Sequence, residues 1–161
     1  MRVPHGGTPD AFRAVMSPAA SLVRSQSPQL SHARILVAED DREMRRLVIE
    51  ELRRDGHDVV DATDGGQLLL RITDFYRLRP TPDPIDLILT DIRMPVCSGF
   101  DIIQGLRDAN WMTPVILMTA FGDDDARTRA RALGAVLLDK PFEMSVLRAH
   151  VRALLRGDRA C

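Results

Sequence analysis

Three carboxylates in this chain each stand at the end of a short apolar run. Glu39 and Asp40 follow RILVA, and Asp91 ends LILTD, with Pro95 four residues later. If the fold brings the three together, their like charges repel unless they are protonated or neutralised by a cation. An all-oxygen set without His or Cys favours Mg²⁺, which leaves room for a phosphate oxygen, and the backbone carbonyl of Arg93 offers one more ligand.

An ordinary structural role, in a turn or a helix cap, can also explain each of these acids. Asp is common in turns, and Asp or Glu before a helix commonly caps it. We favour capping for Asp41, the third acid of EDD. For Glu39 and Asp40 we favour the metal site, because the distant Asp91 is predicted to share their edge of the fold.

A hydroxyl and an amine complete the set of reactive groups. Thr119 ends VILMT and Lys140 follows AVLLD. Alone, each is better explained as a strand terminus or an ion-pair partner. Beside a metal site they supply what phosphoryl transfer needs, namely an ammonium and a hydroxyl for the phosphoryl oxygens of a carboxylate nucleophile. Ala120 leaves the approach to Asp91 open, and Pro141 favours an extended backbone at Lys140.

These groups meet only if the runs that precede them are neighbouring parallel strands. Five runs rich in Val, Ile and Leu are predicted strands, at residues 34–38, 57–62, 85–90, 114–119 and 135–138. Apolar residues recur at helical spacing between the strands and after the last one. This alternation predicts an α/β fold with a parallel sheet covered on both faces. Ligands bind such sheets at the carboxyl ends of the strands, where the strand order reverses.

Composition indicates a single globular domain. The chain has 161 residues, 45% hydrophobic and 28% charged, with a net charge of -1. This charge offers no overall attraction to nucleic acid or anionic membrane. No apolar run approaches the roughly 20 residues that span a bilayer. Two cysteines fit a reducing compartment, so we expect a cytoplasmic protein without a membrane partner.

The folded domain is predicted to occupy only part of the chain. Residues 1–32 are rich in Pro and Ser without a helical or strand period, so we expect a flexible leader. Residues 33–156 form the domain and residues 157–161 a short tail. A Pro-rich loop at 79–84 is longer than the topology needs. Because no further domain follows the last helix, we expect output by protein contact.

Four motifs carry a resemblance to a known family. RILVAEDD, LILTDIRMP, VILMTA and LLDKPF, in this order and at these spacings, resemble the receiver domain of two-component response regulators. The resemblance covers about residues 33–156 and implies a flavodoxin-like sheet of five parallel strands in the order 2-1-3-4-5. It implies phosphorylation of Asp91, Mg²⁺ at Glu39, Asp40, Asp91 and the Arg93 carbonyl, and phosphoryl contacts from Thr119 and Lys140, with Ala120 beside them.

The resemblance also implies how such a chain works. Phosphate comes from the histidine of a kinase or of a histidine phosphotransfer protein. The receiver catalyses only its own phosphorylation and dephosphorylation, so it is a switch rather than an enzyme. We expect it to signal to a downstream protein, or through a phosphorylation-dependent homodimer.

Composition argues against a nucleic-acid partner. The arginines of the last two helices are not interleaved with aromatic residues, and the chain has no basic net charge, so we expect no direct binding to nucleic acid.

Two positions depart from the family pattern. Leu137 stands three residues before Lys140, where the family usually has an aromatic ring that turns inward on phosphorylation. The usual exchange between this ring and the threonine is therefore not expected here. The loop VCSG at 96–99 also varies, and we expect Cys97 to have an ordinary loop or core role rather than a redox role.

Three alternatives remain open at this point. An aspartate-nucleophile phosphatase normally has a second acid two residues after the nucleophile, where Arg93 stands. A flavin-binding module of the same topology needs a phosphate-binding loop after its first strand, where EDD stands. The chain is also compatible with the truncated receiver of a DNA-binding response regulator, because DIRMP occurs in such proteins.

Overall fold

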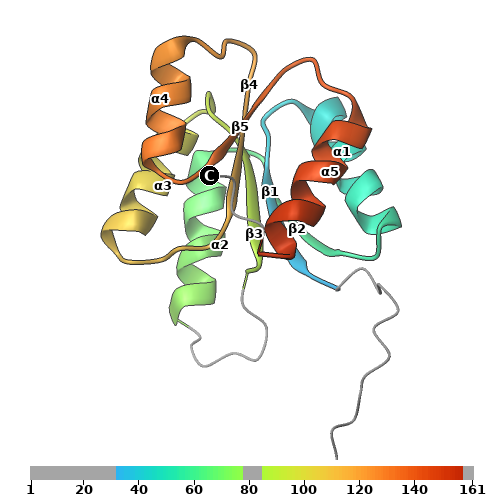
Figure 1. The fold of residues 1–161 in the computed structure, drawn as a ribbon. Helices are drawn as coiled ribbons and strands as arrows, with labels where there is room; N and C mark the ends of the chain where they lie inside the picture. Colours follow the sequence, from blue (N-terminus) through green and yellow to red (C-terminus); the bar gives the residue numbers. More distant parts are fainter. Residues whose placement is uncertain (1–31, 78–84, 158–161) are drawn as a thin grey trace, which may run out of the picture.

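In the computed structural model, residues 32–77 and 85–157 are described, and they form five strands that alternate with five helices (Figure 1). The elements are β1 (Arg34–Ala38), α1 (Arg42–Arg54), β2 (Asp58–Ala62), α2 (Gly65–Arg77), β3 (Leu87–Asp91), α3 (Gly99–Asp108), β4 (Val115–Thr119), α4 (Asp124–Ala132), β5 (Val136–Asp139) and α5 (Met144–Leu155). Apart from His32 and Gly157, the predicted leader and tail lie outside the described residues, as does the loop at 79–84.

All neighbouring strands are parallel and follow the order β2-β1-β3-β4-β5, which confirms the predicted fold class. Every residue of β3 and β4 is buried, as their unbroken apolar runs predicted. The strand order reverses between β1 and β3. In the register, Ala38 pairs with Thr90 and Thr119 with Asp139, so the strands end side by side at one edge.

The helices cover both faces of the sheet and enclose two cores. In Figure 1, α1 and α5 lie on one side and α2, α3 and α4 on the other. Alternate strand residues supply each core: Leu36 and Leu117 face α2, α3 and α4, whereas Ile35 and Leu89 face α1 and α5. Burying one such side chain completely contributes about 1.5–3 kcal/mol. No helix among residues 32–77 and 85–157 is long and apolar enough to cross a membrane.

Element boundaries follow hydrogen bonds rather than apolar runs. Gly56 follows the end of helix α1 with a φ of 89°, a left-handed conformation that favours glycine. Gly134 follows α4 in the same way, with a φ of 63°. His57 was predicted to begin the second strand, but its N–H donates to the carbonyl of Leu52 and closes α1. The strand therefore begins one residue later, at Asp58.

Candidate functional site

The three predicted carboxylates meet where the strand order reverses. Glu39 follows β1, Asp40 begins the turn into α1, and Asp91 is the last residue of β3. Each offers an oxygen that lies within 4.8 Å of an oxygen of the other two. Glu39 and Asp91 are buried, whereas Asp40 is exposed. The cluster is thus a deep acidic site with one open side.

Burial dominates the electrostatics of this cluster. It raises the pKa of Glu39 above its usual value, although a hydrogen bond from Lys140 opposes the shift. Burial likewise raises the pKa of Asp91, against the Lys140 charge, and the negative charge of Asp40 adds to the rise. Keeping these acids ionised therefore costs folding free energy. A divalent cation would offset that cost, and the all-oxygen ligand set fits Mg²⁺.

Lys140 is the cation that the fold brings to these acids. Its Nζ lies 2.6 Å from Glu39 Oε2 and 3.6 Å from Asp91 Oδ1. The Lys140 N–H donates to the carbonyl of Thr119 at 2.7 Å, which fixes the end of β5 against β4. The peptide bond between Lys140 and Pro141 is cis. One ammonium thus pairs with the two buried carboxylates of the cluster.

Thr119 and Ala120 lie on the neighbouring strand end. Thr119 is buried and its hydroxyl oxygen accepts the N–H of Phe121 at 3.1 Å, while Ala120 is exposed. Thr119 also lines a pocket of about 240 Å³ together with Arg93 and Phe121. The Arg93 guanidinium stacks over the Phe121 ring, 5.1 Å from its centre. Sequence reasoning did not single out Phe121, which is 67% exposed.

The capping interpretation of Asp41 is confirmed. Its carboxylate accepts the Met44 N–H at 2.7 Å at the start of α1, and its own N–H donates to Glu39 Oε1. Sequence reasoning missed Arg45, which donates to the carbonyl of Glu39 at 2.7 Å. An arginine in the first helical turn resembles any solvated charge in the sequence, so no local pattern could have revealed this contact.

The two atypical positions have ordinary packing roles. Leu137 is partly buried in β5 and packs against the core on the side of α2, α3 and α4. Cys97 is a free, partly buried thiol that packs against the same core, as expected for a loop or core cysteine. The residue before Lys140 was not predicted to matter, yet Asp139 accepts a hydrogen bond from Arg127 of α4 at 2.6 Å.

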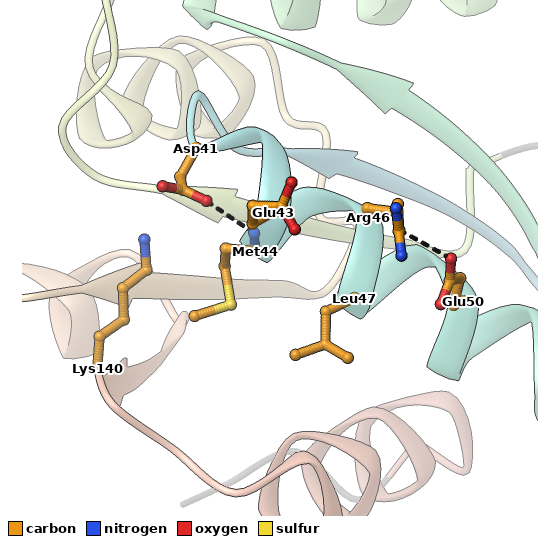
Figure 2. A pocket seen from close by; sticks show the side chains of 7 residues that line it. All are labelled: Asp41, Glu43, Met44, Arg46, Leu47, Glu50 and Lys140. Carbon is orange, nitrogen blue, oxygen red and sulfur yellow. Dashed lines mark hydrogen bonds and ion pairs between the residues drawn. The ribbon is translucent and has the colours of Figure 1, made fainter.

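A second, larger pocket opens beside Lys140. It has a volume of about 500 Å³ and is lined by the exposed face of α1 (Figure 2). Figure 2 shows Lys140 on the far side of this pocket from α1, with its amine directed toward the Asp41 end of the helix. Met44 and the 45% exposed Leu47 form an apolar strip between charged neighbours, among which Arg46 pairs with Glu50 at 3.1 Å.

Comparison with known proteins agrees with this geometry. The family model for the response regulator receiver domain matches residues 35–152. The chain therefore belongs to the receiver-domain family of response regulators. It is 40% identical over 124 residues to the transcriptional regulatory protein CpxR of Escherichia coli strain K12, covering 76% of this chain. The chain spans about half the length of that relative, 49%.

Solved structures show the same fold. The receiver domain of the Francisella response regulator 1452 superposes with a TM-score of 0.69 at 26% identity, covering 79% of this chain and 99% of the other. The response regulator TrrA of Thermotoga maritima, in complex with Mg²⁺-BeF, gives a TM-score of 0.64 at 27% identity, covering 76% and 98%. The family resemblance of the four motifs is thereby confirmed.

Proposed function

We propose that this chain is a phosphorylation-dependent switch in a two-component phosphorelay, and that Asp91 is its phosphoacceptor. The phosphoryl group comes from the histidine of a histidine kinase or a histidine phosphotransfer protein. The observation that carries the proposal is the meeting of buried Asp91 with Lys140 and two further acids at the point where the strand order reverses. Perturbed carboxylates at such an edge are typical of functional sites.

The side chains have distinct roles in the transfer. A carboxylate oxygen of Asp91 attacks phosphorus, a P–O bond forms, and the P–N bond breaks with its electron pair remaining on the donor imidazole, which takes up a proton. The ammonium of Lys140 and the hydroxyl of Thr119 donate to the phosphoryl oxygens, and the small Ala120 leaves space for them. Attack by water later releases phosphate and restores the carboxylate. The chain thus catalyses only its own phosphorylation and dephosphorylation.

We propose that Glu39, Asp40, Asp91 and the backbone carbonyl of Arg93 hold Mg²⁺. When bound, the ion supplies the positive charge that the acids and a phosphoryl oxygen share. The close approach of the three acids supports this proposal, because burial raises the pKa of Glu39 and of Asp91 and makes their ionised forms costly, so that a bound cation would stabilise them. The complex of the similar TrrA with Mg²⁺-BeF is a further support.

The donor protein is proposed to dock on α1. The pocket in Figure 2 lies beside Lys140, and the apolar strip of half-buried Met44 and exposed Leu47 gives a partner helix a surface to cover. Acidic and basic side chains around this strip can orient the partner by charge. Docking there would bring a phosphohistidine to the open side of the site.

The output is proposed to leave through the segment after Thr119. Leu137 is smaller than the aromatic ring usual in the family and carries no hydroxyl, so it cannot make the same exchange. We infer that Thr119 moves toward the phosphoryl group and shifts residues 120–133. NMR spectra with and without beryllofluoride and Mg²⁺ test this: shifts confined to residues 120–133 agree, and equally large shifts at the Leu137 methyls and α5 contradict it.

Output by contact with a downstream protein, or through a phosphorylation-dependent homodimer, follows from the same proposal, with no direct contact to nucleic acid by the described residues. A second candidate is the receiver half of a DNA-binding regulator. The similarity to CpxR, which is a transcriptional regulatory protein, favours it. Both candidates use the same site and differ in what the phosphorylated receiver contacts.

Incubation with acetyl phosphate and Mg²⁺, followed by intact-mass measurement, tests the proposed function. The wild-type chain should gain one phosphoryl group, and Asp91→Asn should gain none, because an amide is not a usable nucleophile. Asp101→Asn is the matched control, since Asp101 is an exposed acid of α3 bound to Ser98 and Arg129. Phosphorylation of Asp91→Asn at the wild-type rate would refute the assignment, and rapid turnover of phosphate esters would favour a phosphatase.

A further inference from the structure

One arginine of α1, Arg45, is largely buried and contacts the backbone of the acidic site. The Arg45 side chain is only 15% exposed, and its Nη1 donates to the backbone carbonyl of Glu39 at 2.7 Å. Its Nε lies 3.6 Å from Asp61 Oδ2 near the end of β2. The guanidinium therefore lies between the carboxyl ends of β1 and β2, with one polar partner on each.

The Glu39 carbonyl belongs to the peptide that joins Glu39 to Asp40. On the other side of Glu39, its N–H donates to the carbonyl of Ala62 at 3.2 Å. Glu39 is thus held by β2 through its N–H and by Arg45 through its carbonyl. Beyond this point the chain leaves the sheet, and no strand partner is left to fix the peptide plane.

The Asp40 carboxylate depends on this backbone for its direction. Asp40 is exposed, and within the described part of the chain no donor forms a hydrogen bond to its carboxylate. By contrast, Glu39 is bound to Lys140 and Asp41 through its own side chain. Of the three acids, Asp40 is therefore the one whose position rests on the peptide that Arg45 holds.

We propose that Arg45 is a positioning residue for the metal ligands: by fixing the Glu39–Asp40 peptide, it aims the Asp40 carboxylate at the site. This inference rests on the proposed function. Arg45 is not among the residues proposed to bind the ion or the phosphoryl group. Groups that orient metal ligands from behind typically change metal affinity by about 10–100-fold when they are removed.

A role as a nearby positive charge and a role in positioning predict opposite changes in the Mg²⁺ affinity of Arg45→Ala. If Arg45 acted only as a nearby positive charge, its removal would strengthen the attraction between the acids and a cation. If it only stabilised the fold, the melting temperature would fall and the Mg²⁺ affinity would stay the same. A positioning role predicts weaker Mg²⁺ binding, by about tenfold.

The same helix offers a matched control. Arg53 also donates to a backbone carbonyl, that of Val59 at 3.2 Å, but at the opposite end of the sheet. Arg53→Ala removes the same side chain and charge from α1 without touching the site. It should leave the Mg²⁺ dissociation constant unchanged.

Calorimetric titration of the full chain with Mg²⁺ alone decides the matter, with no phosphoryl donor needed. The dissociation constant should rise about tenfold in Arg45→Ala and less in Arg45→Lys, which keeps the charge but loses the planar fork. Tighter or unchanged binding in Arg45→Ala would overturn the inference. If Arg45→Ala does not fold, wild-type affinity in Arg45→Lys would overturn it.

Asp40→Ala separates this inference from the proposed function. Weaker binding in Asp40→Ala together with wild-type binding in Arg45→Ala would overturn only the role of Arg45. Wild-type affinity in Asp40→Ala, or no Mg²⁺ binding by the unmodified chain, would overturn the proposed site and the inference with it.

Discussion

The two ends of the sheet both contain buried carboxylates, but in opposite electrostatic situations. At the carboxyl ends of the strands, Glu39 and Asp91 face one ammonium, and burial raises the pKa of each. At the amino ends, Asp55 follows α1 and its side chain is 6% exposed, with Arg148 bound to both its oxygens and Arg152 at 3.5 Å. The hydrogen bond from Arg148 is the main reason why the pKa of Asp55 is lowered.

This difference separates a structural ion pair from the site that we propose to be phosphorylated. Asp55 has more positive than negative neighbours, so its charge is satisfied within the protein and holds α5 against α1. The negative charge of Glu39, Asp40 and Asp91 exceeds the single positive charge of Lys140, so binding of a further cation would stabilise these acids. Burial is the main influence on the pKa of Glu39 and Asp91, whereas the hydrogen bond from Arg148 is the main influence on the pKa of Asp55.

Removing the structural carboxylate should have the largest effect on stability. Asp55→Ala leaves two permanently charged arginines without their partner and should lower the free energy of unfolding by about 2 kcal/mol. This is below the cost for a fully buried pair, because Arg148 and Arg152 are 33% and 36% exposed and water screens them. Urea unfolding measures the loss. Added Mg²⁺ should not restore it, and recovery on adding Mg²⁺ would contradict the comparison.

Removing the cation at the end of the sheet that holds the candidate site should cost less and should be reversible. Lys140→Ala leaves the acids uncompensated, which should lower the free energy of unfolding by roughly 1–2 kcal/mol at pH 7 without metal, because protonation of a carboxylate relieves part of the cost. Mg²⁺ should restore this loss, since Lys140 is not a proposed ligand. The restored variant should still respond weakly to phosphorylation. Unfolding with and without Mg²⁺ checks this, and a loss that Mg²⁺ leaves unchanged would break the contrast with Asp55.

Mg²⁺ should also stabilise the unmodified protein. Binding to the folded chain alone contributes about 1.4 kcal/mol at ten times the dissociation constant. For a domain of this size, the melting temperature should rise by roughly a few degrees. Asp40→Ala should reduce the rise and Asp55→Ala should keep it, as thermal melting curves can show. An equal rise in wild type and Asp40→Ala would place the ion elsewhere.

The pH dependence should be the smallest effect. Burial lowers the pKa of His57 below 6.5, against the charge of Asp55, and neither ring nitrogen has a hydrogen-bond partner among the described residues. Its neutral form contributes stability above pH 6.5 that is lost as the pH falls, because the unfolded chain binds the proton more readily. Glu39 and Asp91 act in the opposite direction, since their raised pKa values make the folded chain take up protons first.

His57→Phe should therefore become more stable relative to wild type as the pH is lowered from 7 to 5.5. Unfolding curves at several pH values measure the difference. A constant difference between the two proteins over this range would show that His57 does not titrate as expected.

Sequence reasoning predicted the fold, and it placed the candidate site residues at one edge of the sheet because each of them stands at or just after the end of a largely apolar strand. A parallel sheet necessarily gathers such groups at one edge, so Glu39, Asp91 and Lys140 come together without knowledge of side-chain contacts. The Asp55 cluster could not be predicted in this way. Arg148 lies 93 residues away from Asp55, and its position on α5 resembles that of any exposed arginine.

Contacts between side chains and the backbone, and hydrogen bonds at element ends, were missed for the same reason. Arg45 reaches a backbone carbonyl, which leaves no trace in the types of its neighbours. The boundary at His57 was misplaced because a hydrogen bond to Leu52, rather than hydropathy, decides where the strand begins.

Helix α1 runs from the carboxyl ends of the strands to their amino ends. Its residues therefore differ in how freely they can be substituted during evolution. Arg45 at its start and Asp55 just after its end each contact groups that the fold or the site requires. Between them, Leu47 is 45% exposed and lines the open pocket of Figure 2. If the proposed donor protein docks there, substitutions of Leu47 after gene duplication would alter the choice of donor without disturbing the core, and parallel signalling pathways would stay apart within one cell.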